Sequence, residues 1–91
     1  MTVKEVKEMY KNEKIADIEV YKDVGGRHNF STDNVENCEE YNENDNVITQ
    51  DLFNEKDYND NLFANADNTV NFTDLYGDKN TKVLCILIDK E

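Results

Sequence analysis

The stretch KVLCILID, residues 82–89, decides the fold, because it holds six consecutive apolar residues between charged ones. Its length and composition are those of a strand that is buried on both faces of a sheet. It is also the longest apolar run in the chain, and a membrane-spanning helix needs about 20 apolar residues. We therefore predict a domain built around a core strand at residues 82–89, with no membrane-spanning segment.

The N-terminal part has the pattern of a helix followed by a strand. Thr2 and Glu5 have the spacing of a capping box, and residues 3–12 place Val3, Val6, Met9 and Tyr10 on one face. Over residues 16–23 the period changes to two, so that apolar and polar side chains alternate along the chain. The sequence predicts an amphipathic helix at residues 3–12 and a half-buried strand at residues 16–23.

Two more strands are expected between this pair of elements and the core strand. Gly25 and Gly26 can adopt the positive φ of a hairpin turn, which predicts a short return strand at residues 27–30. Residues 46–50 are rich in β-branched side chains and lie between polar clusters, as is typical of a strand.

Two further helical segments complete the predicted fold. Residues 55–65 carry apolar side chains at helical spacing behind acidic ones, and residues 72–76 form a helical turn that ends at Gly77. The fold class is therefore predicted to be α+β, with a small, mainly antiparallel sheet packed with two or three short helices. Residues 1–91 are expected to form a single acidic domain.

The net charge of −11 is concentrated in the middle of the chain. Residues 1–32 hold six basic and six acidic side chains, whereas residues 33–78 hold thirteen acids against Lys56 alone. Asparagine, tyrosine and phenylalanine are interleaved with these acids, so the segment has anchors on which to fold. Because self-repulsion of this size destabilises a compact state, we infer that the negative field serves to attract a basic partner.

The residues needed for catalysis or metal binding are scarce. His28 and Ser31 would point to opposite faces of the predicted return strand, which argues against a Ser-His-acid triad. Cys38 lies among glutamates, which disfavour a catalytic thiolate, and neither Cys38 nor Cys85 has a second ligand at a zinc spacing. Residues 57–68 begin like a calcium loop but lack its glycine and final glutamate. We predict that the protein is not an enzyme and holds no cofactor and no metal.

The cysteine count and the N-terminal sequence predict a cytoplasmic protein. Two cysteines do not make the disulfide framework of a small secreted domain, and they are expected to be free thiols. The initial Met is followed by polar residues rather than by the apolar run of an export signal.

Four features taken together point to a class of proteins. They are the length of 91 residues, the pI of about 4.3, the acidic segment from Asp33 to Asp78, and the α+β pattern that opens MTVKEVKEMY. In these features the chain resembles the small acidic inhibitors that phages and prophages encode against host defence, namely antirestriction DNA mimics and anti-CRISPR proteins. The resemblance implies a stoichiometric inhibitor that works in the host bacterial cytoplasm. Its implied target is the basic nucleic-acid-binding site of a defence nuclease, such as an RNA-guided CRISPR nuclease.

Carboxylates on folded elements can imitate duplex DNA, which presents one charge per about 1.7 Å of its axis. We expect the contacts with the basic partner to come from nine acids of the middle segment: Glu36, Glu39, Glu40, Glu43, Asp45, Asp57, Asp60, Asp67 and Asp74. The alternative hypothesis is a non-enzymatic acidic adaptor or regulatory protein that docks a basic partner without competing with DNA. A divalent-metal-binding module is the third hypothesis. No direct binding of nucleic acid or of membranes is expected.

Overall fold

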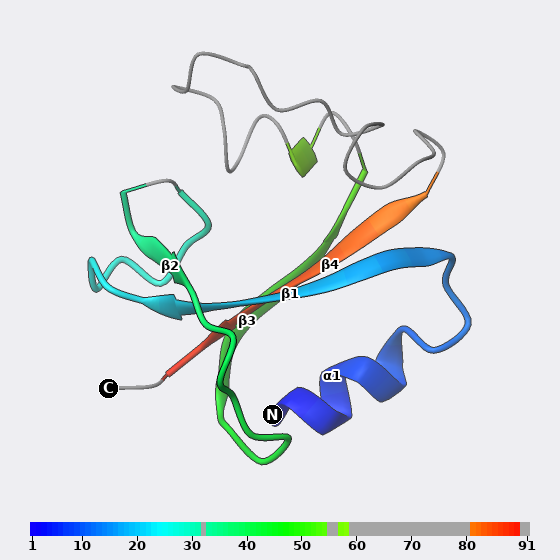
Figure 1. The fold of residues 1–91 in the computed structure, drawn as a ribbon, viewed down its shortest axis with the longest axis horizontal. Helices are drawn as coiled ribbons and strands as arrows, with labels where there is room; N and C mark the ends of the chain where they lie inside the picture. The colour runs from blue at the N-terminus through cyan, green and yellow to red at the C-terminus, as the bar shows by residue number, and fades with distance from the viewer. Residues whose placement is uncertain (32, 55–56, 59–80, 90–91) are drawn as a thin grey trace.

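The fold is a mixed four-stranded sheet with a helix packed on one face (Figure 1). The computed structural model describes residues 1–31, 33–54, 57–58 and 81–89. Within them the order of elements is α1 (Val3–Met9), β1 (Ile15–Asp23), β2 (Val35–Asn37), β3 (Val47–Phe53) and β4 (Lys82–Ile88). The strands lie in the order β2-β1-β4-β3. The pair β1 and β4 is parallel, and the other two pairs are antiparallel.

The central position of β4 confirms the prediction made from its apolar run. This strand lies between β1 and β3, and every side chain from Val83 to Ile88 is 0% exposed. Leu84, Ile86 and Ile88 pack with α1, whereas Val83, Cys85 and Leu87 pack on the opposite face. Both faces of the strand need apolar residues because both are covered, and this explains the run without alternation.

The capping box predicted at the start of α1 is present. Thr2 Oγ1 accepts from the amide of Glu5 at 3.3 Å, and the amide of Thr2 donates to Glu5 Oε1 at 3.0 Å. Val3 and Val6 are buried against the sheet. The helix ends at Met9 rather than at residue 12, and Met9 is 54% exposed instead of lying on the packed face. Turns after Met9 carry the chain into β1.

The predicted return strand at residues 27–30 is wrong. The antiparallel partner of β1 is β2, in the register Tyr21↔Asn37 and Asp23↔Val35, and residues 24–31 and 33–34 lie in the loop between them. Gly26 does take the positive φ, +74°, that the turn prediction required, and His28 follows with a φ of +57°. The turn was therefore correctly located, but a loop follows it.

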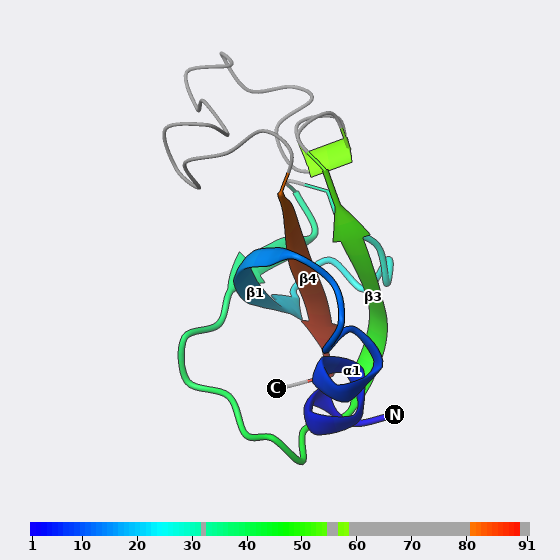
Figure 2. The same ribbon diagram turned by 90° about the vertical axis from the view of Figure 1, so that its right-hand side faces the viewer.

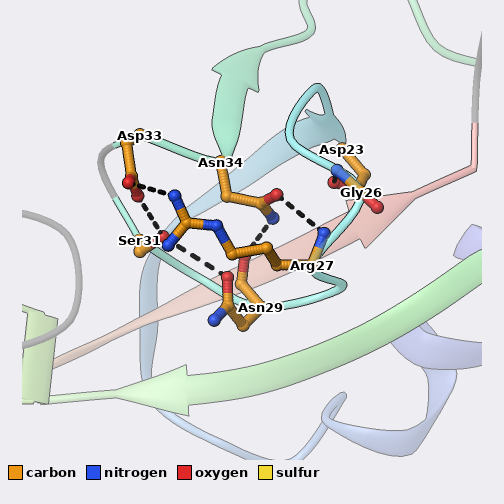
Figure 3. A network of polar contacts seen from close by, with 7 residues as sticks. All are labelled: Asp23, Gly26, Arg27, Asn29, Ser31, Asp33 and Asn34. Carbon is orange, nitrogen blue, oxygen red and sulfur yellow. Dashed lines mark hydrogen bonds and ion pairs between the residues drawn. The ribbon is translucent and has the colours of Figure 1, made fainter.

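The side chain of Asn34 closes this loop by hydrogen bonds, in place of a paired return strand. Its side chain is fully buried, its Oδ1 accepts from the amide of Arg27 at 3.0 Å, and its Nδ2 donates to the carbonyl of Asn29 at 2.7 Å (Figure 3). The Asn34 side chain thus satisfies one backbone N–H and one backbone C=O group of the loop, which pairing with another strand would otherwise satisfy.

The remaining fold predictions have mixed outcomes. The strand expected at residues 46–50 is confirmed and extends to Phe53 as β3. One named helix lies in the described residues, which does not support the expected two or three helices, and the parallel pairing of β1 with β4 makes the sheet mixed. The predicted helical segments at residues 55–65 and 72–76 lie outside the described residues, apart from residues 57–58. None of the described helical structure is long and apolar enough to cross a membrane.

Candidate partner-binding surface

Five of the nine predicted contact acids lie on one connection, residues 36–45, which we call the acidic arm. It leaves the sheet with β2, passes beside the start of α1 and leads into β3 (Figures 1 and 2). The acids that it carries are Glu36, Glu39, Glu40, Glu43 and Asp45.

Backbone bonds fix the acidic arm near both of its ends. Cys38, expected in a polar setting, is buried in the core on the α1 side, and its amide donates to the carbonyl of Val20 at 2.9 Å. Further along, the carbonyl of Glu43 accepts from the amide of Lys4 at 3.0 Å, and that of Asp45 accepts from the amide of Val3 at 3.2 Å. The arm is held against the N-terminus of α1, where those amides have no partner within the helix.

A lysine of α1 holds the middle of the acidic arm. Lys7 Nζ lies 2.8 Å from Glu43 Oε1 and 3.1 Å from the hydroxyl of Tyr41, and it lies 5.1 Å from the centre of the Tyr41 ring. Desolvation acts to lower the pKa of Lys7, but the bonds to Glu43 and Tyr41 outweigh it, and the pKa is raised. This lysine remains charged and neutralises Glu43.

Two other acids of the arm also have structural partners. Glu36 faces Lys22 across the pairing of β1 with β2, with 3.7 Å between Oε1 and Nζ. Asp45 is half-buried, and its Oδ2 accepts from the amide of Asn42 at 2.7 Å, which shapes the turn before β3. Glu39 and Glu40 are exposed. Glu36 and Glu43 are exposed as well, so the arm displays four carboxylates to solvent.

The remaining four predicted acids are not brought to the acidic arm within the described residues. Asp57 belongs to the segment 57–58, which lies beyond β3 at the end of the sheet away from the N-terminus in both views (Figures 1 and 2). Its amide donates to Asn54 Oδ1 at 2.9 Å. Asp60, Asp67 and Asp74 lie outside the described residues. Within the described residues, therefore, five of the predicted acids lie together on the acidic arm and Asp57 follows β3.

Sequence reasoning missed a second group of acids, on the sheet face opposite α1. The strand registers place Glu19, Cys85 and Asp51 in one row, with Asp17 beside Val83 in the next. The signal was available in the alternation of the predicted strand at residues 16–23, which puts Asp17 and Glu19 on one face.

Two tyrosine hydroxyls hold the Glu19 carboxylate of this group. Tyr21 donates to Glu19 Oε2 at 2.7 Å, and Tyr58 donates to Glu19 Oε1 at 3.2 Å. Both tyrosines are buried in the core on this face. Glu19 therefore joins β1 to the segment that follows β3, which is a structural role.

The chemistry of this group does not activate the Cys85 thiol. Burial, followed by the nearby carboxylates of Glu19, Asp51 and Asp17, raises the pKa of Cys85. The thiol is kept protonated and unreactive. No three His, Cys, Asp or Glu side chains are grouped to hold a metal ion anywhere in the described part of the chain.

His28 and Ser31 are not assembled into a catalytic pair. Ser31 Oγ donates to Asp33 Oδ1 at 2.7 Å and to Asn29 Oδ1 at 3.3 Å (Figure 3). His28 Nε2 lies 3.3 Å from Asp23 Oδ2. They do not lie on a strand, as the sequence predicted, and they have different partners: Ser31 bonds within the loop, whereas His28 lies beside the last residue of β1.

Folding places basic side chains of residues 1–32 beside acids of the middle segment. Lys7, Lys22 and Arg27 pair with Glu43, Glu36 and Asp33, so cations of the neutral N-terminal third meet acids of the middle. The described residues still contain fifteen carboxylate side chains against seven Lys and Arg, an excess of eight negative charges. These ion pairs therefore neutralise only part of the negative charge.

Comparison of the chain with protein-family models, with curated proteins and with solved structures finds no match.

Proposed function

We propose that the protein is a stoichiometric inhibitor that binds the basic nucleic-acid-binding site of a bacterial defence nuclease, in the host cytoplasm. The proposed target class includes RNA-guided CRISPR nucleases. The observation that supports this function best is the acidic arm, which displays Glu39 and Glu40 on a backbone tied to Val20 at one end and to α1 at the other.

A fixed backbone matters because binding costs free energy for every segment that must be ordered. Ordering one rotamer-rich side chain at an interface costs about 0.5–1.5 kcal/mol, and a mobile acidic loop would add its backbone to that cost. The acidic arm is already held in place before a partner arrives. The excess of eight negative charges in the described residues also favours fast association with a basic surface at low salt.

Position along the arm and structural contacts rank the contact acids. Glu39 and Glu40 come first because they are exposed and lie between the backbone bonds that fix the two ends of the arm. The pair between Glu36 and Lys22 is long and largely exposed, and such pairs contribute only about 0–1 kcal/mol, so a partner's arginine can replace Lys22. Glu43 is held closely by Lys7 and Asp45 shapes a turn, so both serve the arm's conformation.

The experiment compares two charge reversals of equal size. The variant Glu39→Lys/Glu40→Lys changes the acidic arm, and the matched control Glu8→Lys/Glu13→Lys changes two exposed acids outside it. Each variant is immobilised and used to capture proteins from a bacterial lysate at about 0.05 M and then about 0.5 M NaCl, and duplex DNA is added to the captured material.

The inhibitor proposal expects capture of a nuclease or another DNA-binding protein that duplex DNA releases. Capture should persist in the control and be lost in the arm variant, while circular dichroism shows both variants folded. Equal capture by both variants would reject the acidic arm as the site. A captured partner that DNA cannot displace would favour the acidic adaptor instead.

A further inference from the structure

The outer edge of β3 is a second candidate interaction surface. The sheet order leaves β2 and β3 at the edges, with three residues in β2 and seven in β3. The amide of Val47 donates to the carbonyl of Met1 at 2.8 Å, and Thr2 bridges Asn46, so the N-terminus covers the start of this edge. Among the described residues, no strand pairs with the rest of it.

The hydrogen bonds of β4 show which backbone groups of β3 point outward. The amide of Lys82 donates to Lys14, on the β1 side, and backbone groups alternate between the two sides of a strand. The odd-numbered residues of β4 therefore face β3, and their register partners in β3, at positions 49, 51 and 53, face back. The backbone N–H and C=O groups of Gln50 and Leu52 therefore point away from β4, towards the open edge of the sheet. In agreement, the amide of Leu52 donates to the carboxylate of Asp51, at 2.8 Å.

We propose that this edge pairs with the same edge of a second copy, antiparallel, about a two-fold axis at Gln50. The segment is self-complementary about that residue. The two Gln50 backbones exchange a pair of hydrogen bonds, and Thr49 lies opposite the partner's Asp51. The threonine hydroxyl can donate to the carboxylate opposite it. The bulge between Val47 and Thr49 places Ile48 on the face opposite α1, whereas Leu52 packs on the α1 face, so these two side chains do not form a cross-strand pair.

The alternative axis at Asp51 is disfavoured by charge. It would place the two Asp51 carboxylates directly opposite each other, and like charges in that position are destabilising. It would also place Gln50 opposite the partner's Leu52. The Gln50 axis has neither mismatch.

Two features make the pairing weak and dependent on salt. Met1 and Thr2 restrict it to about the five residues 48–52, and each copy carries a net charge of −11. The Debye length falls from about 10 Å at 0.1 M salt to about 3 Å at 1 M, so screening should promote the dimer. This dependence is opposite to that expected for binding of a basic partner, and the pairing does not rest on the proposed function.

The first test is sedimentation equilibrium of the unmodified chain from about 10 µM to about 1 mM, at about 0.05 M and about 1 M NaCl. The average mass should rise from 10.6 kDa towards twice that value with concentration, and more so at high salt. A mass of one chain under all these conditions would overturn the proposal.

The register is tested by three variants. Thr49→Lys places a cation opposite the partner's Asp51 twice per dimer, which should raise the association constant roughly 2- to 30-fold, and Thr49→Glu should lower it. Asn37→Lys is the matched control, because it makes the same charge change at an exposed position of β2, the other edge. If Thr49→Lys and Asn37→Lys change dimerisation equally, the β3 register is wrong.

Hydrogen exchange gives an answer that needs no variant. The Gln50 amide points outward, so its exchange at high salt should slow as the protein concentration rises, while that of exposed Asn37 should not. Exchange of Gln50 that is independent of concentration, in a sample that dimerises, would place the interface elsewhere.

Discussion

Lys7 on α1 and Glu43 in the acidic arm lie 36 residues apart in the chain, and their charged groups are 2.8 Å apart. The contact ties the amphipathic helix to the connection that displays the predicted contact acids. Tyr41 completes it, because its hydroxyl lies 3.1 Å from the same Nζ. A change at Lys7 should therefore be felt in the acidic arm as well as in the helix.

Replacing this lysine should loosen the acidic arm. Lys7→Met keeps the aliphatic part of the side chain and removes the bonds to Glu43 and Tyr41, which should lower the free energy of unfolding by about 1 kcal/mol. Urea denaturation measures this change. The control is Lys11→Met, which removes a more exposed pair with Glu8 and should change stability by less than about 0.5 kcal/mol. Equal effects of the two variants would contradict a special role for Lys7.

The same pair should make stability fall in strong base. The pKa of Lys7 is raised in the folded protein, so its contribution is fully present below the unfolded pKa, near 10.5, and is lost as the pH rises through the folded pKa. The difference in unfolding free energy between wild type and Lys7→Met should be constant from pH 7 to about pH 10 and shrink above it. A difference in unfolding free energy that grows above about pH 10 would contradict this prediction.

The capping box should contribute at neutral pH and fail in acid. Hydrogen bonds from the amide and then from the hydroxyl of Thr2 lower the pKa of Glu5. Its contribution is therefore present above the unfolded pKa, near 4.5, and is lost as the pH falls through the folded pKa. Glu5→Gln should be less stable than wild type at pH 7 and should approach it as the pH is lowered from about 5 to about 3. Thermal unfolding across that range tests this, and a stability difference independent of pH would contradict it.

The success and failure of the sequence predictions have distinct physical causes. β4 could be predicted because burial on both faces requires a continuous apolar run. Its parallel pairing with β1 could not, because residues about 65 positions apart meet there and no local pattern encodes that choice. The return strand at residues 27–30 failed because a Gly-Gly turn signals a reversal, whereas the loop is closed by the side chain of Asn34.

The electrostatics of the acidic surface depend on contacts that a count along the chain does not contain. Counting charge selected Glu39 and Glu40 as expected contacts, but it treated residues 1–32 as electrically separate from the middle segment. Folding brings Lys7 and Lys22 to Glu43 and Glu36, and it places Asp17 and Glu19 in the same sheet as Asp51. Net charge is additive along the sequence, whereas the surface field depends on which elements become neighbours.

Gly25 should be intolerant of a side chain because of its contact with Asn34. A Cβ atom at Gly25 would lie 2.5 Å from Asn34 Oδ1, the oxygen that accepts from the amide of Arg27. Gly25→Ala should therefore break that bond and cost about 1–3 kcal/mol. Asn34→Ala should also destabilise the loop. In the double variant, however, Gly25→Ala should add little, because the clashing atom is gone. Additive losses in chemical denaturation would show that the contact is not the cause.

Cys85 should be chemically silent until the sheet opens. It is 0% exposed in the central strand, and burial together with the carboxylates of Glu19, Asp51 and Asp17 raises its pKa, so both access and thiolate formation are suppressed. With iodoacetamide at about pH 8, near the ordinary thiol pKa, alkylation of Cys85 should follow the unfolded fraction as urea is added, with peptide mapping separating it from Cys38. Asp51→Asn removes one of the carboxylates but leaves the strand buried, so native Cys85 should stay unmodified in that variant too. Rapid alkylation of Cys85 in the native protein would contradict its position in β4, because this strand is paired on both sides, with β1 and with β3.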